Sequence, residues 1–344
     1  MKHNKIAFFC VGTGGHVLPV KYLISDLLNK GFQRDLIEVI TDKRGAKFLS
    51  DLDIKISTIN IYRSEIGKIG YFLNIFKQIN TYINIKKEMD LDNTKAIFTT
   101  GSYIAPFAAA IALIHKKTIF IQEQNIYAGL GNQIASYVNG TVFTSFPDTQ
   151  NINKKRISYV GPIMSSNLTR NKIIEDKLVI GVMGGSQGSR EINNLLFRFL
   201  DNYELKNIKF IHIVGPKNID STRIYKGYKQ IDYVENMNDF YSEIDIQISR
   251  SGGGVLEPVI LGIPLILLPY RYGTTANHQQ KNAEYLVNKK LAKICESYED
   301  FESEILKLDS LKKDWFKHIK KNELFTSGND KIINSIISEL KNEI

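Results

Sequence analysis

Cysteine is scarce in this chain, since Cys10 and Cys295 are the only two among 344 residues. Two thiols cannot build a disulfide framework, and by themselves they cannot form a zinc site. Such scarcity is typical of proteins that fold in a reducing cytosol. The class of small disulfide-stapled proteins is therefore excluded.

The chain also has few long apolar runs. The run from Ile6 to Val11 is short and leads into glycines with no small-residue cleavage site, so we expect a buried strand there rather than a signal peptide. The longer run 255–270 contains Glu257 and three prolines. We expect no transmembrane segment.

Charged residues are plentiful, but the two signs are unevenly divided. The chain carries 45 Lys+Arg and 36 Asp+Glu, a net charge of +9. Residues 1–160 hold 20 basic and 12 acidic side chains, and the remaining 184 hold 25 and 24. The first part is therefore near +8 and the second near +1. A basic half indicates an anionic partner, which at this point is a nucleic acid, a phosphorylated substrate or a membrane surface.

Short apolar, β-branched runs alternate with helical patterns along both halves, which predicts parallel sheets covered by helices on both faces. The length favours two doubly wound α/β domains over one barrel. Gly161-Pro162 breaks the pattern, so we place the domains at 1–160 and 161–328. The segment 329–344 has the apolar spacing of an amphipathic helix, and whether it packs back on the first domain is left open. The predicted strands are 5–11, 37–41, 96–101, 118–124, 141–145, 178–185, 210–215, 244–253 and 264–270.

The first half has a glycine-rich turn, 12–16, directly after its first strand and before a helix. Backbone N–H groups in such a turn approach phosphate oxygens closely, and the helix N-terminus adds positive potential. Val17 replaces the third glycine of a dinucleotide fingerprint, so a nicotinamide enzyme with Asp42 on the ribose is the less favoured alternative. A tight turn without a ligand is the other.

The second half has two such turns, 184–190 and 250–254, each between a strand and a helix. Their N–H groups converge on the carboxyl edge of one sheet, which suits a diphosphate at a topological switch point. Arg250 either adds positive charge there or forms a salt bridge inside the domain. Glu257 either accepts hydrogen bonds from ribose hydroxyls or matches the dipole of its helix.

Two more polar clusters, 100–103 and 122–125, follow predicted strands, and packing alone does not account for them. His16 is the favoured general base because it lies in a glycine-rich loop at a strand end, with phosphate contact or capping as the alternative. His278 is placed in a ligand loop. The pairs Asp51/Asp53 and Asp90/Asp92 are read as solvated charges, so no metal site and no cofactor are expected. No role is assigned to His3, His115, His212 and His318.

In their order, these loops resemble the MurG family of glycosyltransferases. The matching stretches are GTGGHVLPV, TGSYIAP, IQEQNIYAGLGNQIA, VGPI, GVMGGSQGSREIN, YVENMNDFY, SRSGGGVLEPVILGIPLILLPY and NHQQKNA, between positions 12 and 283. The resemblance implies a GT-B fold of two Rossmann-like, doubly wound domains facing a central cleft. Members commonly have an arginine shortly after the hinge proline, where this chain has Met164.

The resemblance implies transfer of N-acetylglucosamine from UDP-N-acetylglucosamine to the C4 hydroxyl of the muramyl sugar of lipid I, with inversion, giving lipid II for peptidoglycan. It assigns catalysis to His16 and Glu123, and the acceptor site to Gly14, His16, Tyr103 and Gln124. The donor residues that it implies are Thr13, Gly14, Gly15, Asn125, Asn132, Gly185, Ser186, Gln187, Asn193, Val234, Arg250, Glu257, Gln279 and Gln280.

The stretch 66–85 has apolar residues at helical spacing flanked by lysines, which suits an interfacial helix on anionic lipid as well as a core-facing helix. Together with the basic first half and the lipid diphosphate acceptor that the resemblance implies, it predicts a peripheral protein on the cytoplasmic face of the cell membrane. A lipid glycosyltransferase with a diacylglycerol acceptor and a non-catalytic nucleotide-binding regulatory module are the alternatives. A UDP-sugar epimerase fits the motifs poorly, and a nucleic-acid partner is disfavoured because the basic residues are scattered.

Overall fold

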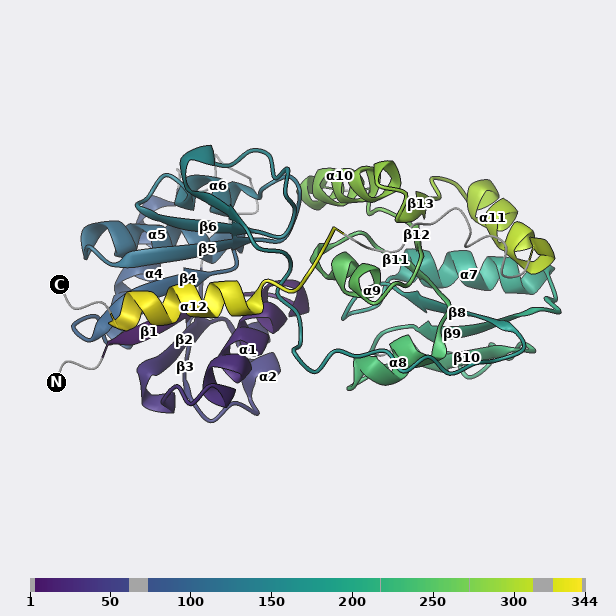
Figure 1. The fold of residues 1–344 in the computed structure, drawn as a ribbon, viewed down its shortest axis with the longest axis horizontal. Helices are drawn as coiled ribbons and strands as arrows, with labels where there is room; N and C mark the ends of the chain where they lie inside the picture. The colour runs from purple at the N-terminus through teal and green to yellow at the C-terminus, as the bar shows by residue number, and fades with distance from the viewer. Residues whose placement is uncertain (1–3, 62–73, 217, 272, 312–323, 342–344) are drawn as a thin grey trace. The chain divides into compact units, whose positions relative to one another are not determined.

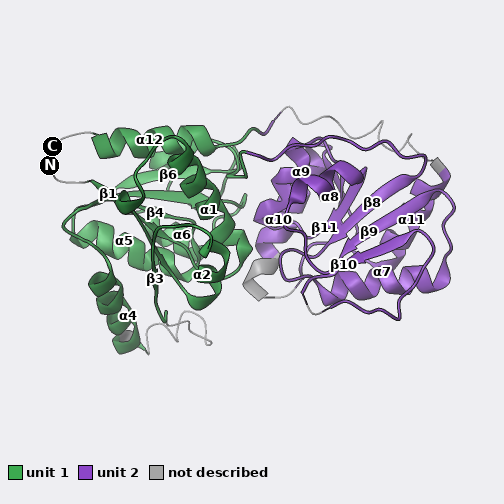
Figure 2. Cartoon of the chain, turned by 90° about the horizontal axis from the view of Figure 1, so that it is seen from below, with its two compact units in different colours: residues 1–166, 326–344 green, residues 167–325 purple. Residues whose placement is uncertain are grey.

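All strands pair in parallel, in two separate sheets (Figure 1). The computed structural model describes residues 4–61, 74–216, 218–271, 273–311 and 324–341. The chain forms two compact units: unit 1 is residues 1–166 with 326–344, and unit 2 is residues 167–325 (Figure 2). The chain thus leaves unit 1 after Ser166 and returns to it after Phe325.

Unit 1 contains a seven-stranded sheet in the order β3-β2-β1-β4-β5-β6-β7. Its central strand β1 pairs with β2 on one side and β4 on the other. The strands are β1 Lys5–Phe9, β2 Ile37–Thr41, β3 Lys55–Thr58, β4 Thr94–Thr99, β5 Thr118–Glu123, β6 Gly140–Thr144 and β7 Ile157–Tyr159. The helices are α1 Gly14–Asn29, α2 Lys43–Leu49, α4 Ile75–Glu88, α5 Ala105–Ile114, α6 Leu130–Ala135 and α12 Asn329–Lys341.

The unit 1 sheet is buried on both faces, as its continuous apolar strands require. Ile6 and Phe8 of β1 join a cluster with α1 and α12, whereas Ala7 and Phe9 join a second cluster with α5. Side chains alternate between the faces of a strand, so each strand of this kind contributes to both clusters. The run from Ile6 to Val11 is therefore core strand and the turn that follows it.

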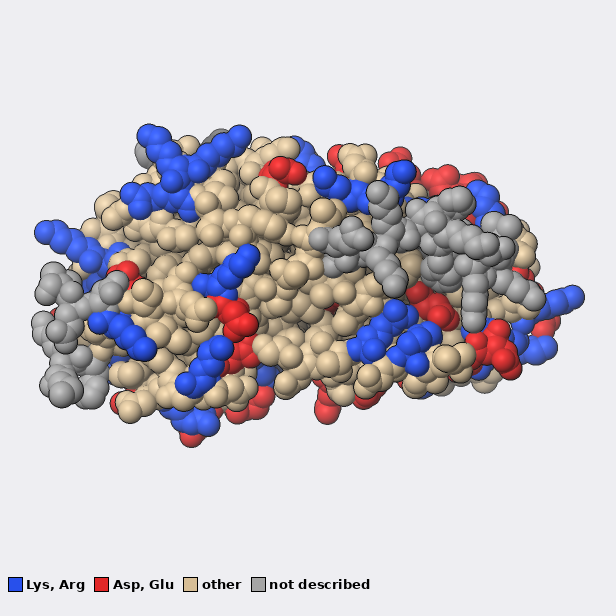
Figure 3. Space-filling view, viewed as in Figure 1, with Lys and Arg blue, Asp and Glu red and all other residues tan. Residues whose placement is uncertain are grey.

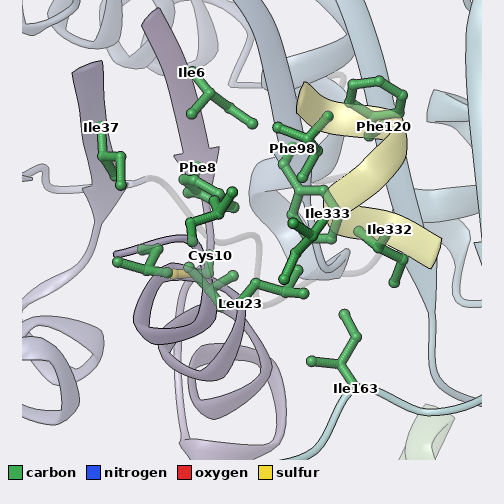
Figure 4. Close-up of a cluster of buried hydrophobic side chains, with 14 of the residues drawn as sticks. Ile6, Phe8, Cys10, Leu23, Ile37, Phe98, Phe120, Ile163, Ile332 and Ile333 are labelled. Atoms are coloured by element: carbon green, nitrogen blue, oxygen red, sulfur yellow. The ribbon is translucent and has the colours of Figure 1, made fainter. Parts of the chain in front are cut away.

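The C-terminal helix α12 covers one face of the unit 1 sheet. Ile332 and Ile333 are fully buried and belong to the same cluster as Phe98 and Phe120, as the close-up of that cluster shows (Figure 4). The helix begins at Asn329, at the position where the sequence predicted its start. The last segment of the chain thus completes the core of the first unit.

A buried polar cluster holds the start of α12 in place. Asn329 Nδ2 donates to Asp26 Oδ2 of α1 at 2.6 Å and to the Met164 carbonyl at 2.8 Å. Ser166 Oγ also donates to Asp26 Oδ2, at 2.6 Å. Met164 is buried, and its N–H donates to Asn329 Oδ1 at 3.2 Å. The position where the family commonly has arginine is therefore used here for packing and backbone pairing.

Unit 2 contains a six-stranded sheet in the order β10-β9-β8-β11-β12-β13. Apolar side chains of β8 pack mainly with α7 and α11 on one face, and those of β9 pack with α8 on the other. The strands are β8 Leu178–Met183, β9 Ile208–Ile213, β10 Tyr228–Ile231, β11 Ile246–Ser249, β12 Leu265–Leu267 and β13 Ala292–Ile294. The helices are α7 Arg190–Asn202, α8 Met237–Glu243, α9 Leu256–Ile260, α10 Gly273–Asn288 and α11 Tyr298–Leu311. Among the described residues of both units, no helix is long and apolar enough to cross a membrane.

We predict that Asn329→Ala lowers the free energy of unfolding by about 2 to 4 kcal/mol, because the buried Asp26 carboxylate loses one of its two donors and the Met164 backbone loses its side-chain partner. Urea unfolding followed by circular dichroism measures the change. Asn334→Ala is the matched control: Asn334 is exposed on the same helix, and its loss should change stability by no more than about 0.5 kcal/mol. Equal effects of the two substitutions would contradict the anchoring role of Asn329.

Candidate functional site

Each sheet has one topological switch point, and the glycine-rich turns lie there. In unit 1 the chain winds from β1 out to β3 and then resumes at β4 on the other side of β1. In unit 2 it winds from β8 to β10 and resumes at β11 beside β8. Loops leaving the two central strands diverge at such a point and leave a crevice at the carboxyl edge, where α/β proteins bind ligands.

The turn after β1 presents backbone rather than side chains. Gly12 has a φ of +96°, a conformation that glycine adopts readily. Helix α1 then begins at Gly14, and the Thr13 side chain makes no capping hydrogen bond with any described residue. A Cβ atom added at Gly15 would meet nothing within 4 Å in the part of the chain that the structure describes. The first N–H groups of α1 therefore face space in which an anion could be held.

His16 ties this turn to the loop after β4. Its Nδ1 lies 2.9 Å from the Thr100 carbonyl oxygen, and Thr100 Oγ1 donates to the His16 carbonyl at 2.7 Å. A carbonyl only accepts, so Nδ1 carries the proton, and in the neutral ring Nε2 then carries the lone pair. This is the tautomer that a general base at Nε2 needs. Ser102, in the same loop, has a φ of +66°, which is uncommon for a residue other than glycine.

Tyr103 belongs to a charged cluster beside the turn after β1. Its hydroxyl donates to Asp42 Oδ2 at 2.9 Å, and Arg44 contacts both groups, at 3.2 Å from Nη2 to each. Asp42 Oδ1 accepts from the N–H groups of Gly12 at 3.1 Å and Gly45 at 2.8 Å. Despite partial burial, these hydrogen bonds lower the pKa of Asp42, because they favour its charged form. Asp42 therefore orders the glycine turn and caps α2, and Arg44 is a member of this cluster that the sequence motifs did not indicate.

Glu123 is buried at the end of β5, and its carboxylate organises the loop that follows. Oε1 accepts from the Asn125 backbone at 2.8 Å and its side chain at 3.0 Å. Oε2 accepts from Gly129 N at 3.1 Å and Asn132 Nδ2 at 2.9 Å. Four donors on one carboxylate fix its orientation. Gln124 Nε2, close by in the chain, is buried without a hydrogen-bond partner among the described residues.

The turn after β8 in unit 2 repeats the arrangement of the turn after β1. Gly185 has a φ of +93°, and an added Cβ would meet nothing within 4 Å among the described residues. Gly188 has a φ of +73° and packs so closely that an added Cβ would lie 2.1 Å from the Val214 carbonyl oxygen. The Ser189 side chain caps α7 by accepting from Ile192 N at 3.4 Å. One side of this turn is thus packed on the fold, while the Gly185 side is open to a ligand.

Arg250 forms the internal salt bridge that the sequence left as one of two possibilities. Its Nη2 lies 2.5 Å from Glu191 Oε2 and 2.9 Å from Ser189 Oγ. Its Nη1 donates to the Leu268 carbonyl at 2.8 Å and the Pro269 carbonyl at 3.3 Å. The side chain is only 10% exposed. Arg250 therefore joins the turns after β8, β11 and β12, and Glu191 partly offsets its charge.

Glu257 lies in the first turn of α9, where Tyr241 OH donates to its Oε2 at 3.2 Å. Desolvation raises the pKa of Glu257 to about 7, although the Tyr241 hydroxyl favours the charged form. A carboxyl that titrates near neutral pH at the carboxyl edge of a sheet is a candidate functional group. Any further hydrogen-bond donor beside Glu257 would stabilise the charged form of its carboxylate.

The remaining unit 2 candidates lie on elements that border this edge. Val234 is in the loop after β10, and Asn193 is buried in the first turn of α7. Gln279 and Gln280 are on α10, where Gln279 Oε1 accepts from Tyr270 N at 2.9 Å and Gln280 Nε2 donates to Glu284 Oε1 at 3.0 Å. Each unit by itself gathers the residues that the motifs indicated. Within the described ranges, no group of three or more His, Cys, Asp or Glu could hold a metal ion.

Two all-parallel α/β units, each with an open glycine turn at its switch point, define a protein of the GT-B fold. The fold matches the crystal structure of MurG from Acinetobacter baumannii with a TM-score of 0.76, at 22% identity, over 97% of this chain and 99% of that one. It also matches a UDP-N-acetylglucosamine 2-epimerase, with a TM-score of 0.64 at 11% identity, over 100% of this chain and 99% of that one. The fold is therefore shared with enzymes of different chemistry.

The chain belongs to glycosyltransferase family 28. The N-terminal domain of that family matches residues 6–144, and its C-terminal domain matches residues 179–336. A Bacillus thuringiensis (strain Al Hakam) relative, 28% identical over 99% of both chains, is named UDP-N-acetylglucosamine–N-acetylmuramyl-(pentapeptide) pyrophosphoryl-undecaprenol N-acetylglucosamine transferase 1. A relative of the same name without the numeral, from Sulfurihydrogenibium sp. (strain YO3AOP1), is 28% identical over 96% of this chain and 97% of its own.

We predict that Gly15→Ala lowers kcat/KM for sugar transfer at least about tenfold, because the added methyl occupies the space where a ligand approaches the α1 N-terminus. The same change replaces glycine inside a helix, so the melting temperature should stay the same or rise. Steady-state kinetics and thermal unfolding test both halves of the prediction. Wild-type kcat/KM in a folded variant would show that nothing approaches Gly15 during the reaction.

Proposed function

We propose that this enzyme transfers N-acetylglucosamine from UDP-N-acetylglucosamine to the C4 hydroxyl of the muramyl sugar of lipid I, forming lipid II. The observation that carries the proposal is the pair of open glycine turns at the two switch points, Gly12–His16 and Gly184–Ser189. The names of relatives aligned over nearly the whole chain identify which sugar and which lipid. Neither a diacylglycerol acceptor nor a non-catalytic module is favoured by these relatives.

The donor is assigned to unit 2. The diphosphate would lie against the open side of Gly185, with Ser186 and Gln187 beside it and the positive end of α7 behind it. Glu257 would accept hydrogen bonds from the ribose hydroxyls, and the backbone of Val234 would bind uracil. Gln279 and Gln280 would contact the sugar hydroxyls. The family resemblance also assigns Thr13, Gly14, Gly15, Asn125 and Asn132 to donor binding, and these residues belong to unit 1.

The acceptor is assigned to unit 1, with His16 as the general base. Nε2 of His16 would take the proton of the C4 hydroxyl while O4 attacks the anomeric carbon of N-acetylglucosamine. The bond from that carbon to the β-phosphate oxygen breaks, its electron pair leaves on UDP, and the configuration inverts. The N–H groups of the Gly184–Ser189 turn and the α7 dipole would stabilise the charge that develops on UDP.

The hydrogen bonds of Glu123 indicate how it would contribute. The four donors to its carboxylate come from the loop 125–129 and from Asn132 at the start of α6. We assign Glu123 to holding that loop, and Gln124 and Tyr103, with Gly14, to contact with the acceptor. Arg250, which is paired with Glu191, would act mainly by ordering the turns around the diphosphate.

We also assign a membrane contact to unit 1. In α4, Ile85 is buried, but Phe76, Ile79 and Ile83 are 84%, 49% and 42% exposed, on the other side of the helix. Lys77, Lys86 and Lys87 are exposed beside them. The sequence predicted either a core-facing or an interfacial helix. In α4 one face is buried in unit 1, and the opposite face is apolar and exposed. Residues 66–73 of the predicted stretch, with Ile69 and Phe72, lie outside the described residues.

The end of α5 extends this apolar surface. Leu113 and Ile114 are 65% and 61% exposed, and His115 Nε2 lies 3.1 Å from the Tyr82 hydroxyl of α4. Figure 3 shows basic side chains spread over unit 1 among uncharged ones, several of them gathered near α6 and β6. Exposed apolar groups with lysines beside them suit the interface of an anionic bilayer. The protein would thus lie peripherally on the cytoplasmic face of the cell membrane.

Transfer of labelled N-acetylglucosamine from the UDP-sugar to lipid I tests the reaction, with diacylglycerol as the control acceptor. We expect product from lipid I alone, and product from diacylglycerol alone would overturn the proposal.

His16→Ala should lower kcat at least about 100-fold, the low end for a general base, while UDP binding persists. Near-normal turnover of that variant would remove His16 from the role.

The raised pKa of Glu257 predicts proton release when the donor binds. Ribose donors stabilise the carboxylate, so binding of UDP-N-acetylglucosamine at pH 7 should release up to about half a proton. Affinity should accordingly rise from pH 6 to pH 8, as the unbound carboxyl loses its proton. Calorimetry in two buffers of different ionisation enthalpy measures the release. Glu257→Gln should abolish it, and equal release by that variant would contradict the ribose contact.

Sedimentation with liposomes tests the membrane surface. Phe76→Ser with Ile79→Ser should weaken binding to anionic vesicles at least about tenfold, because two apolar side chains no longer enter the bilayer. Added salt should weaken wild-type binding by screening. Ile224→Ser is the matched control, since Ile224 is 86% exposed but belongs to unit 2. Equal loss in the control, or no wild-type binding at low salt, would contradict the assignment.

A further inference from the structure

His212, to which the sequence motifs assigned no role, is fully buried at the centre of a chain of side-chain hydrogen bonds in unit 2. Its Nε2 lies 3.1 Å from Asn193 Oδ1 on α7, and its Nδ1 lies 2.9 Å from the Tyr228 hydroxyl on β10. Asn193 Nδ2 in turn donates to the Val214 carbonyl at 3.0 Å, at the end of β9. The helix α7 and the strands β9 and β10 of unit 2 are thus joined through one imidazole.

The direction of each hydrogen bond follows from the last acceptor. The Val214 carbonyl only accepts, so Asn193 faces it with Nδ2 and presents Oδ1 to His212. His212 Nε2 must then carry the proton, and Nδ1 accepts from the Tyr228 hydroxyl. Burial lowers the pKa of His212 to about 3, so the ring is neutral and keeps this single tautomer at physiological pH. The chain of donors therefore runs one way, from Tyr228 through His212 and Asn193 to Val214.

Val214 and Gly215 form the surface on which the turn after β8 rests. An added Cβ at Gly188 would lie 2.1 Å from the Val214 oxygen, and one at Gly215 would lie 2.5 Å from the Gln187 oxygen. Backbone packs on backbone at this point, with no side chain to absorb a displacement. A shift of Val214 therefore moves Gln187 and Gly188 directly. Asn193 adds a second link, because it lies in the first turn of the helix that the same turn opens.

We infer that His212 is a positioning residue for the donor diphosphate: its ring sets the amide of Asn193 and, through Val214, the conformation of the Gly184–Ser189 turn. This inference rests on the proposed donor site. It adds the side chains of Tyr228, His212 and Asn193, which would act through the backbone of Val214. Asn193 uses one amide N–H for the Val214 carbonyl and its oxygen for His212, so we assign it mainly to linking these two residues. Glu257 lies on α9 and Val234 in the loop after β10, and neither side chain is a member of this chain of hydrogen bonds.

The distinction between diphosphate and nucleoside supplies the test. Binding of UDP and of uridine to the full-length protein is measured by calorimetry. His212→Leu fills the space of the ring with an apolar side chain and removes both hydrogen bonds. It should weaken UDP binding about tenfold and leave the affinity for uridine within about twofold of wild type. His212→Gln can donate to Asn193 from Nε2 and should hold UDP binding within about threefold of wild type. Equal losses for UDP and uridine in His212→Leu would overturn the inference, as would unchanged UDP binding.

Phe199→Leu separates positioning from general destabilisation. Phe199 is fully buried on α7 in the same core, so the variant loses stability without touching the hydrogen-bond chain. It should bind UDP and uridine as wild type does. If His212→Leu does not fold, Tyr228→Phe replaces it, and a UDP loss no larger than its uridine loss would overturn the inference. Wild-type protein that binds no UDP at all would instead overturn the proposed donor.

Discussion

Parallel pairing of every strand is the constraint from which the site follows. In a parallel sheet all carboxyl ends lie at one edge, and the helices that follow the strands begin at that edge. Both units therefore present helix N-termini and turn N–H groups where the strand order reverses, between β1 and β4 and between β8 and β11. At these turns Gly15 and Gly185 leave open space beside the backbone among the described residues.

Charged side chains at these edges act on the turns more than on a ligand. Asp42 holds the Gly12 turn and pairs with Arg44, while Arg250 holds three unit 2 turns and pairs with Glu191. Such pairing leaves the backbone dipoles as the main positive potential beside each turn. The excess charge of the first 160 residues is accordingly a property of the surface, beside the exposed apolar face of α4.

The nine strands read from the sequence are all present, and the four that it missed, β3, β7, β10 and β13, are the edge strands of the two sheets. An edge strand has one neighbour and partly exposed side chains, so it lacks the continuous apolar run of a central strand. The site follows the same division. Glycine turns and His16 were visible as motifs, whereas Arg44 joins Tyr103 only through the fold, and His212 looked like one histidine among six.

The sequence by itself determined the two parallel α/β sheets, the glycine turns at their carboxyl edges and the family, because apolar runs, glycines and motif order are local properties of the chain. Tertiary structure alone decided that α12 completes unit 1, where Asn329 meets Asp26 across 303 positions of the chain. It also decided that His212 meets Asn193, whose amide donates to the Val214 carbonyl beside the Gly184–Ser189 turn. Both contacts depend on which buried polar groups face one another, and a linear pattern does not record that.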